Sequence, residues 1–184
     1  MWPFLYFAGD RLSTAELTAA RLDGDLVEIG EGFMPADAVE TRELRAASLR
    51  TFVRDSLAVT HESAAWVHGA IADPPTPHFV QRVTAHRIPY VVGSRVHYRD
   101  QRLPPGDSTR ISGLATATPV RTLVDLVREV VGHAAAAPDT VEAMCAWRPE
   151  LIPAAIAWLE RARPVHYKRP ALAYLRERQE VVTR

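Results

Sequence analysis

Prolines divide residues 57–118 into short β-rich runs, which fit only the strands of a small sheet. The runs are H-F-V-Q-R-V-T-A, Y-V-V-G-S-R-V-H-Y-R and T-R-I-S, and they are separated by P-P-T-P, I-P and L-P-P-G-D. Because proline cannot donate a ladder hydrogen bond, it belongs in loops and at sheet edges. We therefore expect a small mixed or antiparallel sheet in this region.

From Thr118 onward the apolar pattern becomes helical. Thr118 and Pro119 are favoured at the N-cap and in the first turn of a helix. The apolar residues that follow have helical spacing: Leu123, Leu126, Val127 and Val130. Further helices are expected near residues 139–147, 150–163 and 170–180. A sheet region followed by helices predicts an α+β fold with a helical C-terminus, and 184 residues allow one main domain with a small extra module.

The first 40 residues predict that extra module. Ser13 and Glu16 have the spacing of a capping box, so a helix is expected through A-E-L-T-A-A-R-L, ending at Gly24. The runs D-L-V-E-I and F-M-P then flank a glycine-bearing turn at residues 30–32, which predicts a β-hairpin. A helix followed by a hairpin is the order found in the second half of a winged helix. We expect a reduced winged-helix-like module over residues 1–40, and the main domain, beginning with a helix from Thr41 to about Asp55, over 41–184.

The stretch T-H-E-S-A-A-W-V-H-G at residues 60–69 is predicted to be a scaffold helix. Thr60 suits the N-cap, Glu62 the first turn, and Gly69 a left-handed C-terminal cap. His61 and His68 lie seven residues apart, about 10 Å along a helix axis, whereas zinc ligands on one helix are spaced i, i+4. This spacing argues against a metal site and favours packing of Trp66 and the alanines.

Charge is unevenly distributed along a chain whose 22 basic and 22 acidic residues balance. Residues 1–40 hold two arginines against eight acidic residues, a net charge of −6. Residues 82–110 have a surplus of four positive charges, and residues 161–184 a surplus of five. If nucleic acid or a partner is bound, the arginine-bearing strands, with Tyr90 and Tyr98 interleaved, are the better-placed surface, although the same arginines can equally form a solvated sheet face. The arginines assigned to a nucleic-acid or partner surface are Arg11, Arg21, Arg82, Arg87, Arg95, Arg99 and Arg102.

No catalytic residue, metal ligand or cofactor site is predicted. Ser63 lacks the glycine-flanked elbow or S-x-x-K pattern of a serine nucleophile, and L-P-P-G-D is too poor in glycine for a phosphate loop. The only lysine, Lys168, follows no acidic strand pair of the kind that a nuclease needs. We therefore expect a non-enzymatic protein, and a nuclease or metal hydrolase is the least favoured of three function classes.

The compartment is predicted from a single cysteine. Cys145 cannot form an internal disulfide, so a reducing, cytoplasmic setting is expected. The apolar opening M-W-P-F-L-Y-F-A lacks the pattern of a signal peptide, and no other run approaches the ~18 apolar residues of a membrane span. The opening is expected to be buried as a strand or helix stub.

Four segments in a fixed order resemble the AbiEi family of abortive-infection antitoxins, especially its actinobacterial branch. They are G-D-L-V-E-I-G-E-G-F, T-H-E-S-A-A-W-V-H-G, L-P-P-G-D and G-L-A-T-A-T-P-V-R-T-L-V-D-L-V-R. The resemblance covers about residues 12–131. The motif residues, for which we expect a structural role, are Ser63, Trp66, His68, Gly69, Arg121 and Asp125. For Arg121 two roles are open: an intrahelical ion pair with Asp125, or a contact reaching across to the 60–69 helix.

The resemblance implies a bacterial toxin–antitoxin protein without enzymatic activity or cofactor. Relatives of this kind bind operator DNA through an N-terminal winged helix to repress their own operon. Their following α/β domain counteracts a nucleotidyltransferase-like toxin without a stable complex. Some relatives add a very-short-patch-repair-like endonuclease, for which this chain ends too early.

The N-terminal module departs from the family pattern at the residues that would read DNA. Only one helix fits before the hairpin, and Glu31 stands at the turn where family wings usually carry arginine. Since DNA affinity comes largely from neutralising phosphates, a net charge of −6 opposes binding. Two readings follow: an antitoxin that also regulates transcription of its operon, or a protein-interaction module that has lost DNA binding. In the second, the acidic module would meet a basic surface on a partner or on a second copy, forming a homodimer.

Overall fold

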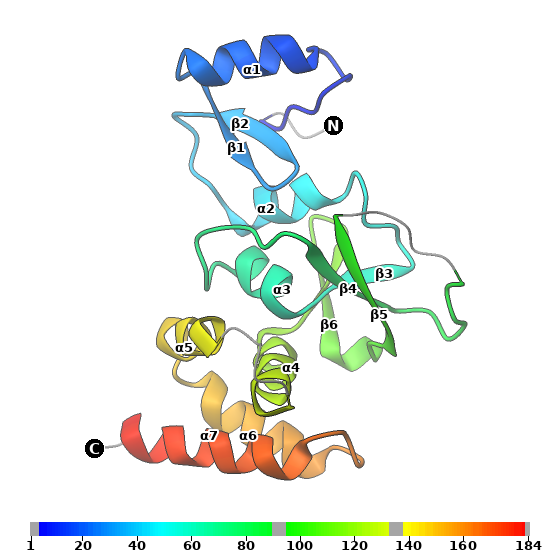
Figure 1. The fold of residues 1–184 in the computed structure, drawn as a ribbon, viewed down its shortest axis with the longest axis vertical. Coiled ribbons are helices and arrows are strands. Elements are labelled where there is room, and N and C mark those ends of the chain that lie inside the picture. Colours follow the sequence, from blue (N-terminus) through cyan, green and yellow to red (C-terminus); the bar gives the residue numbers. More distant parts are fainter. Residues whose placement is uncertain (1–3, 90–94, 133–137, 183–184) are drawn as a thin grey trace.

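The computed structural model describes residues 4–89, 95–132 and 138–182 (Figure 1). The elements follow one another along the long axis of the molecule, from α1 and the hairpin at one end to α7 at the other. The helices are α1 (Thr14–Leu22), α2 (Arg42–Leu49), α3 (His61–His68), α4 (Pro119–Gly132), α5 (Pro138–Trp147), α6 (Leu151–Arg161) and α7 (Lys168–Val182). The strands are β1 (Leu26–Ile29), β2 (Gly32–Pro35), β3 (Leu57–Val59), β4 (His78–Arg82), β5 (Val96–Arg102), β6 (Ser108–Ile111) and β7 (Leu114–Ala117), and η1 (Pro105–Asp107) is a short 3-10 turn.

The predicted helix and hairpin of the N-terminal module are confirmed. Ser13 caps α1 through its Oγ, which accepts a hydrogen bond from the Glu16 amide, and Glu16 accepts one from the Ser13 amide at 2.7 Å. Both halves of the capping box are therefore present. Strands β1 and β2 pair antiparallel, with Ile29 opposite Gly32.

The central sheet is mixed, in the order β5-β4-β3-β7-β6. Strands β3 and β7 run parallel, as do β4 and β5, while the other neighbours are antiparallel. The expected strand over residues 90–99 begins, in the part of the chain described, at Val96 and continues to Arg102, while residues 90–94, including Tyr90, lie outside the described ranges. Strand β7, L-A-T-A, was not predicted, because two of its four residues are alanines, which give little strand signal.

Helix α2 is shorter than the expected helix over residues 41–55. It ends at Leu49, with Arg50 as its C-cap, because the following residues form turns instead. The amide of Val53 donates to the Leu49 carbonyl, and the amide of Leu57 to the Arg54 carbonyl. Phe52 packs against the core from these turns, so its apolar signal came from packing and not from a longer helix.

Two apolar clusters hold the fold together. The first lies around the sheet, α2 and the hairpin, and it joins Ile29 and Met34 of the hairpin to Leu49 and Trp66 of the main domain. The second lies among α4, α5, α6 and α7, with Ala65 of α3 at its edge. The overall α+β class with a helical C-terminus is as predicted, while the division of the chain at residue 40 stays a prediction.

Candidate functional site

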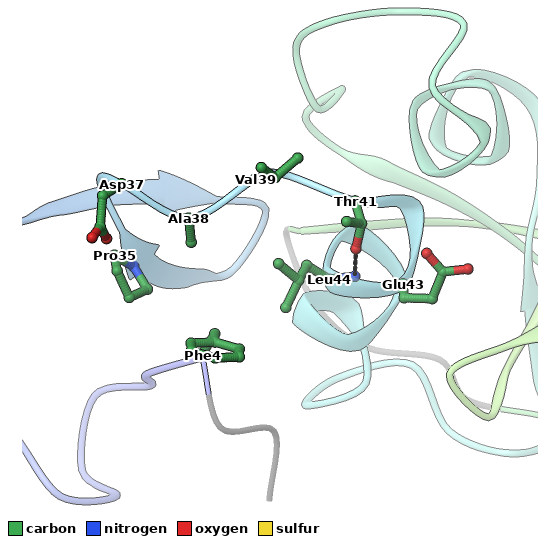
Figure 2. A pocket seen from close by; sticks show the side chains of 8 residues that line it. All are labelled: Phe4, Pro35, Asp37, Ala38, Val39, Thr41, Glu43 and Leu44. Carbon is green, nitrogen blue, oxygen red and sulfur yellow. Dashed lines mark hydrogen bonds between the residues drawn. The ribbon is translucent and has the colours of Figure 1, made fainter.

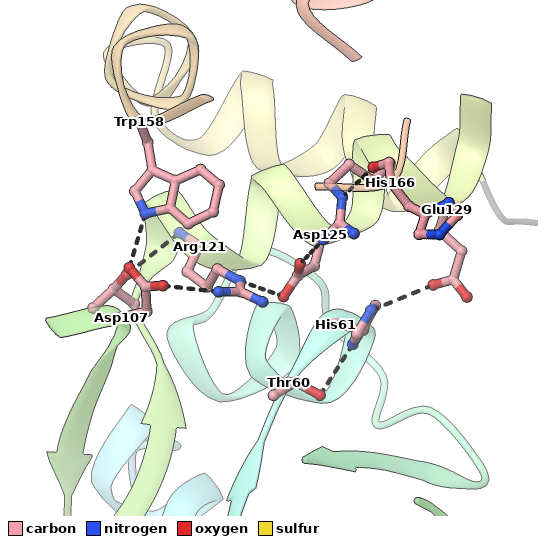
Figure 3. A network of polar contacts seen from close by, with 10 residues as sticks. Thr60, His61, Asp107, Arg121, Asp125, Glu129, Trp158 and His166 are labelled. Carbon is pink, nitrogen blue, oxygen red and sulfur yellow. Dashed lines mark hydrogen bonds and ion pairs between the residues drawn. The ribbon is translucent and has the colours of Figure 1, made fainter. Parts of the chain in front are cut away.

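A buried polar network joins two of the quoted sequence segments to α6 (Figure 3). Nε of Arg121 lies 2.7 Å from Oδ2 of Asp125, the ion pair within α4 that the sequence predicts. Nη1 of the same guanidinium lies 2.8 Å from Oδ2 of Asp107, in L-P-P-G-D. The other carboxylate oxygen of Asp107 accepts a hydrogen bond from the indole Nε1 of Trp158 in α6, at 2.8 Å. Of the two roles left open for Arg121, the ion pair within α4 is therefore present, and the ion pair that it forms beyond α4 is with Asp107.

The charged side chains of Arg121 and Asp125, at the centre of this network, are both buried. Asp125 is 1% exposed at its side chain, and Arg128 also pairs with it, with 2.9 Å between Nη1 and Oδ1. Burial lowers the pKa of Arg121, but the pairing with Asp125 and Asp107 outweighs it, so the pKa lies above its ordinary value. Arg121 is thus fully charged, and breaking its pairing would leave a buried charge without its partner.

Helix α3 is fixed to the sheet by its own motif residues. Nε2 of His68 donates to the carbonyl of Ala117, at the end of β7, over 2.7 Å. Oγ of Ser63 accepts a hydrogen bond from the Phe79 amide in β4 at 2.8 Å. Trp66 is 1% exposed, and Gly69 ends the helix with φ of 93°. These contacts place the motif residues in the framework of the domain, and their role in function stays a prediction.

The histidines of α3 do not converge on one point. His61 begins the helix and His68 ends it. Among the residues that the structure describes, no group of three or more His, Cys, Asp or Glu side chains is placed to hold a metal ion. Burial raises the pKa of the Cys145 thiol, which makes it a poor nucleophile at neutral pH.

The tip of the β1–β2 hairpin is packed into the main domain. Glu31 forms an ion pair with Arg95, and its Oε1 lies 3.6 Å from Nε2 of His78. Gly30 has φ of 52°, and a Cβ at this position would lie 2.9 Å from the Trp66 ring and would collide with Ser48. In a winged helix the corresponding turn faces DNA, whereas here the turn contacts the main domain of the same chain.

Four arginines of the predicted basic surface lie on β4, β5 and the segments beside them, and each of them contacts an acidic residue. Arg82 and Arg87 both contact Asp100, each with 2.9 Å between Nε and a carboxylate oxygen. Arg95 pairs with Glu31, as described above, and Arg99 pairs with Glu129 of α4. The hydroxyl of Tyr98 also donates to Asp100.

The three remaining arginines of that surface are scattered. Arg21 lies in α1, where its Nη1 is 3.2 Å from Oε1 of Glu28. Arg11 is exposed in the segment before α1, and Arg102 is exposed at the end of β5. The seven arginines therefore do not form one continuous basic stripe, and their part in binding stays a prediction.

An apolar groove that sequence reasoning missed lies between the N-terminal module and α2 (Figure 2). It has a volume of about 580 Å³, and Phe4, Pro35, Val39 and Leu44 supply most of its apolar lining. Phe4 and Val39 remain 54% and 79% exposed. The lining comes from Phe4 and from residues 35–44, which are distant in the chain, so no local pattern in the sequence indicated that they meet.

A family model for the AbiEi antitoxin C-terminal domain matches residues 57–177. The chain belongs to the AbiEi antitoxin family. The match includes α3, and it also includes L-P-P-G-D and α4, which are the two segments that Arg121 joins. An antitoxin of this family implies a cognate toxin.

One solved structure is also similar to this AbiEi protein, the crystal structure of the Rv2827c protein from Mycobacterium tuberculosis. The alignment has 18% identity and a TM-score of 0.36, and it covers 89% of this chain and 70% of that one. No curated protein matches the sequence. Within the described ranges, no helix has both the length and the apolarity to cross a membrane.

Proposed function

We propose that the chain is a non-enzymatic antitoxin that counteracts a nucleotidyltransferase-like toxin without a long-lived complex, and that its N-terminal module makes protein contacts instead of reading operator DNA. Family membership supports the first part. The inward-packed hairpin tip supports the second part, and it is the observation on which the choice between the two readings rests. A transcriptional autoregulator that reads DNA through this hairpin is the alternative.

Charge supports the same choice. A DNA-binding wing neutralises phosphates with exposed arginine or lysine. Here the turn carries Glu31, already paired with Arg95, within a module of net charge −6. On the neighbouring strands, Arg82 and Arg87 share Asp100, and Arg99 pairs with Glu129. Of these three arginines, one positive charge is left without a carboxylate of its own for a phosphate backbone.

The exposed apolar side chains of the N-terminal module support protein contact. Four of the large apolar residues that remain exposed in the described ranges belong to residues 1–40: Phe4, Leu22, Val27 and Val39. The exposed apolar residues favour an apolar partner surface. The negative charge of the module favours basic side chains on the same partner surface. We take the groove at Val39 as the contact surface of the module.

Two measurements test the proposal separately. Co-expression with the nucleotidyltransferase-like toxin encoded beside this gene should relieve growth arrest, and failure to do so would reject the antitoxin assignment. Labelled DNA from upstream of the gene should not be retained in a low-salt gel shift. Specific retention below about 1 µM protein, tighter than ordinary non-specific binding, would reject the protein-contact reading and favour autoregulation.

A further inference from the structure

A polar cavity of about 300 Å³ lies where β5, the start of α3, α4 and the segment before α7 meet. Every residue that lines it is polar: two arginines, two carboxylates, two histidines, a glutamine and a tyrosine. Figure 3 shows His61 and Glu129 facing each other here, with Asp125 and His166 nearby. Ligand pockets are usually mostly apolar with a few polar groups, so this lining suits a ligand rich in hydrogen-bonding atoms.

Two residues that line the cavity have an unfavourable backbone conformation. The described non-glycine residues with positive φ are His61 (50°), Tyr167 (58°) and Ser112 (51°). Ser112 lies in the turn between β6 and β7, where such angles are ordinary. His61 and Tyr167 both line the cavity. Backbone strain of this kind concentrates at binding sites, where the surrounding fold holds it in place.

The charges of the lining cancel in pairs, which restricts the ligand. Arg99 pairs with Glu129, and Arg128 pairs with Asp125. A free anion would meet the two carboxylates, and a free cation would meet the two guanidinium groups. A zwitterion would have to separate both ion pairs. A neutral group with alternating donors and acceptors, such as a nucleobase, can use the remaining hydrogen-bonding positions without disturbing either pair.

His61 offers such a position. It is 3% exposed, and its Nδ1 lies 3.0 Å from Oγ1 of Thr60. Its Nε2 lies 3.7 Å from Oε2 of Glu129, too far for a hydrogen bond. Burial lowers its pKa to about 4, so the imidazole is neutral at pH 7 and its Nε2 can serve a neutral ligand.

Tyr167 connects the cavity to a second hollow, whose lining combines two basic residues with prolines, Val165 and Leu172. It is 42% exposed, and it lines both the polar cavity and an adjoining hollow of about 750 Å³. Arg169, which is exposed, and Lys168 supply the charge of this second hollow. Nζ of Lys168 already donates to the carbonyls of Glu160 and Ala162, which leaves one of its three donor positions for a ligand. The Tyr167 ring packs against Gly132 at the end of α4, where a Cβ would collide with it. An exposed aromatic ring between a neutral polar cavity and a basic surface matches the succession of base and phosphate in a nucleotide.

We propose that these two hollows bind one nucleotide unit, with the base in the polar cavity beside Tyr167 and the phosphate at Lys168 and Arg169. The unit is either a free mononucleotide or the terminal nucleotide of a single-stranded RNA. This site is separate from the hairpin and from the groove at Val39, and the proposal does not depend on the proposed antitoxin function.

Titration calorimetry of the full-length chain with AMP, GMP, CMP and UMP tests the proposal. At least one mononucleotide should bind, while inorganic phosphate and ribose 5-phosphate should not, because neither carries a base. A short single-stranded RNA is titrated in parallel. Tighter binding of the RNA supports the terminal nucleotide, and equal or weaker binding supports the free one. Absence of binding by all four mononucleotides, or equal binding of phosphate alone, would overturn the proposal.

A matched pair of variants tests the place of binding. Tyr167→Gly removes the ring and suits the positive φ, so the fold should be kept, and affinity should fall about tenfold. Ser112→Gly relieves the same backbone angle far from the cavity and should leave affinity unchanged. Arg169→Ala, on an exposed side chain, should weaken mononucleotide binding but not nucleoside binding. Equal affinity of the Tyr167→Gly variant and the unchanged protein would reject the site.

Discussion

Arg121 and Asp107 join the helical region of the molecule to the sheet. Their side chains meet with 2.8 Å between Nη1 and Oδ2, and Asp107 extends the connection to Trp158 in α6. Arg121 also pairs with Asp125 and lies over the Trp158 ring. One buried guanidinium thereby fixes α4, α6 and the turn before β6 relative to one another, in the part of the chain that defines the family.

Asp107→Asn should destabilise the protein by about 3 kcal/mol, because it leaves the buried Arg121 with one carboxylate in place of two. Asp73→Asn, at an exposed aspartate, serves as the control and should change stability by less than about 0.5 kcal/mol. Urea-induced unfolding of both variants at pH 7 measures the difference. Equal stabilities would show that the Arg121–Asp107 contact contributes nothing.

The second prediction concerns the hairpin tip. Gly30→Ala and Gly24→Ala both place a side chain at positive φ, which costs about 1 kcal/mol. A Cβ at Gly24 meets nothing within 4 Å, whereas at Gly30 it collides with Ser48 and lies 2.9 Å from Trp66. Gly30→Ala should therefore cost at least about 2 kcal/mol more than Gly24→Ala in thermal or urea unfolding. Similar costs would mean that the hairpin tip moves freely away from the main domain.

Local signals in the sequence were sufficient for most of the elements. The capping box at Ser13, the Thr118-Pro119 start of α4 and the Gly69 cap each depend on residues within a few positions of one another, and each was predicted correctly. The α+β class and the mixed sheet follow from the same local patterns. Strand β7 was missed because its residues, Leu114–Ala117, are weak strand formers that are held by Val59 on one side and β6 on the other.

The candidate site was less predictable, because its contacts join residues that are distant in the chain. Asp107 was assigned only to a turn, although its carboxylate bonds Arg121 and Trp158. From the sequence alone, the arginine-rich strands are predicted to form a basic surface. The sequence does not show that Glu31 pairs with Arg95, or Glu129 with Arg99, in the folded protein. Charge counts along a sequence cannot show which charges are paired in space.

The third prediction concerns the pH dependence of stability. Burial lowers the pKa of His61 from about 6.5 in the unfolded chain to about 4 in the folded protein. Between these values the unfolded state binds more protons, so the free energy of unfolding falls as the pH falls from 6.5 toward 4. Between pH 6.5 and pH 4, His61 should lower the free energy of unfolding by about 3 kcal/mol.

His61→Asn tests this, because asparagine cannot titrate and tolerates positive φ. The variant should lose less stability than the unchanged protein between pH 7 and pH 5 in urea unfolding. Burial also lowers the pKa of His68 and of His78, so the difference between the two proteins reports His61, and neither slope does so alone. His86→Asn, at an exposed histidine, is the control. Identical pH profiles for the unchanged protein and His61→Asn would contradict the assignment.

The last prediction tests the groove as the surface through which the N-terminal module meets its partner. Val39 is 79% exposed and lines the groove, while Leu22 is 76% exposed on the same module and does not. Aspartate at either position should leave stability within about 0.5 kcal/mol, because neither side chain is buried. Val39→Asp should weaken relief of growth arrest in co-expression with the toxin, because a negative charge replaces an apolar contact at an already acidic surface. A tenfold loss of the module's affinity for its partner would correspond to about 1.4 kcal/mol. Leu22→Asp should retain full relief. Equal loss in both variants would indicate a general effect of added negative charge, and equal retention would place the contact elsewhere on the antitoxin.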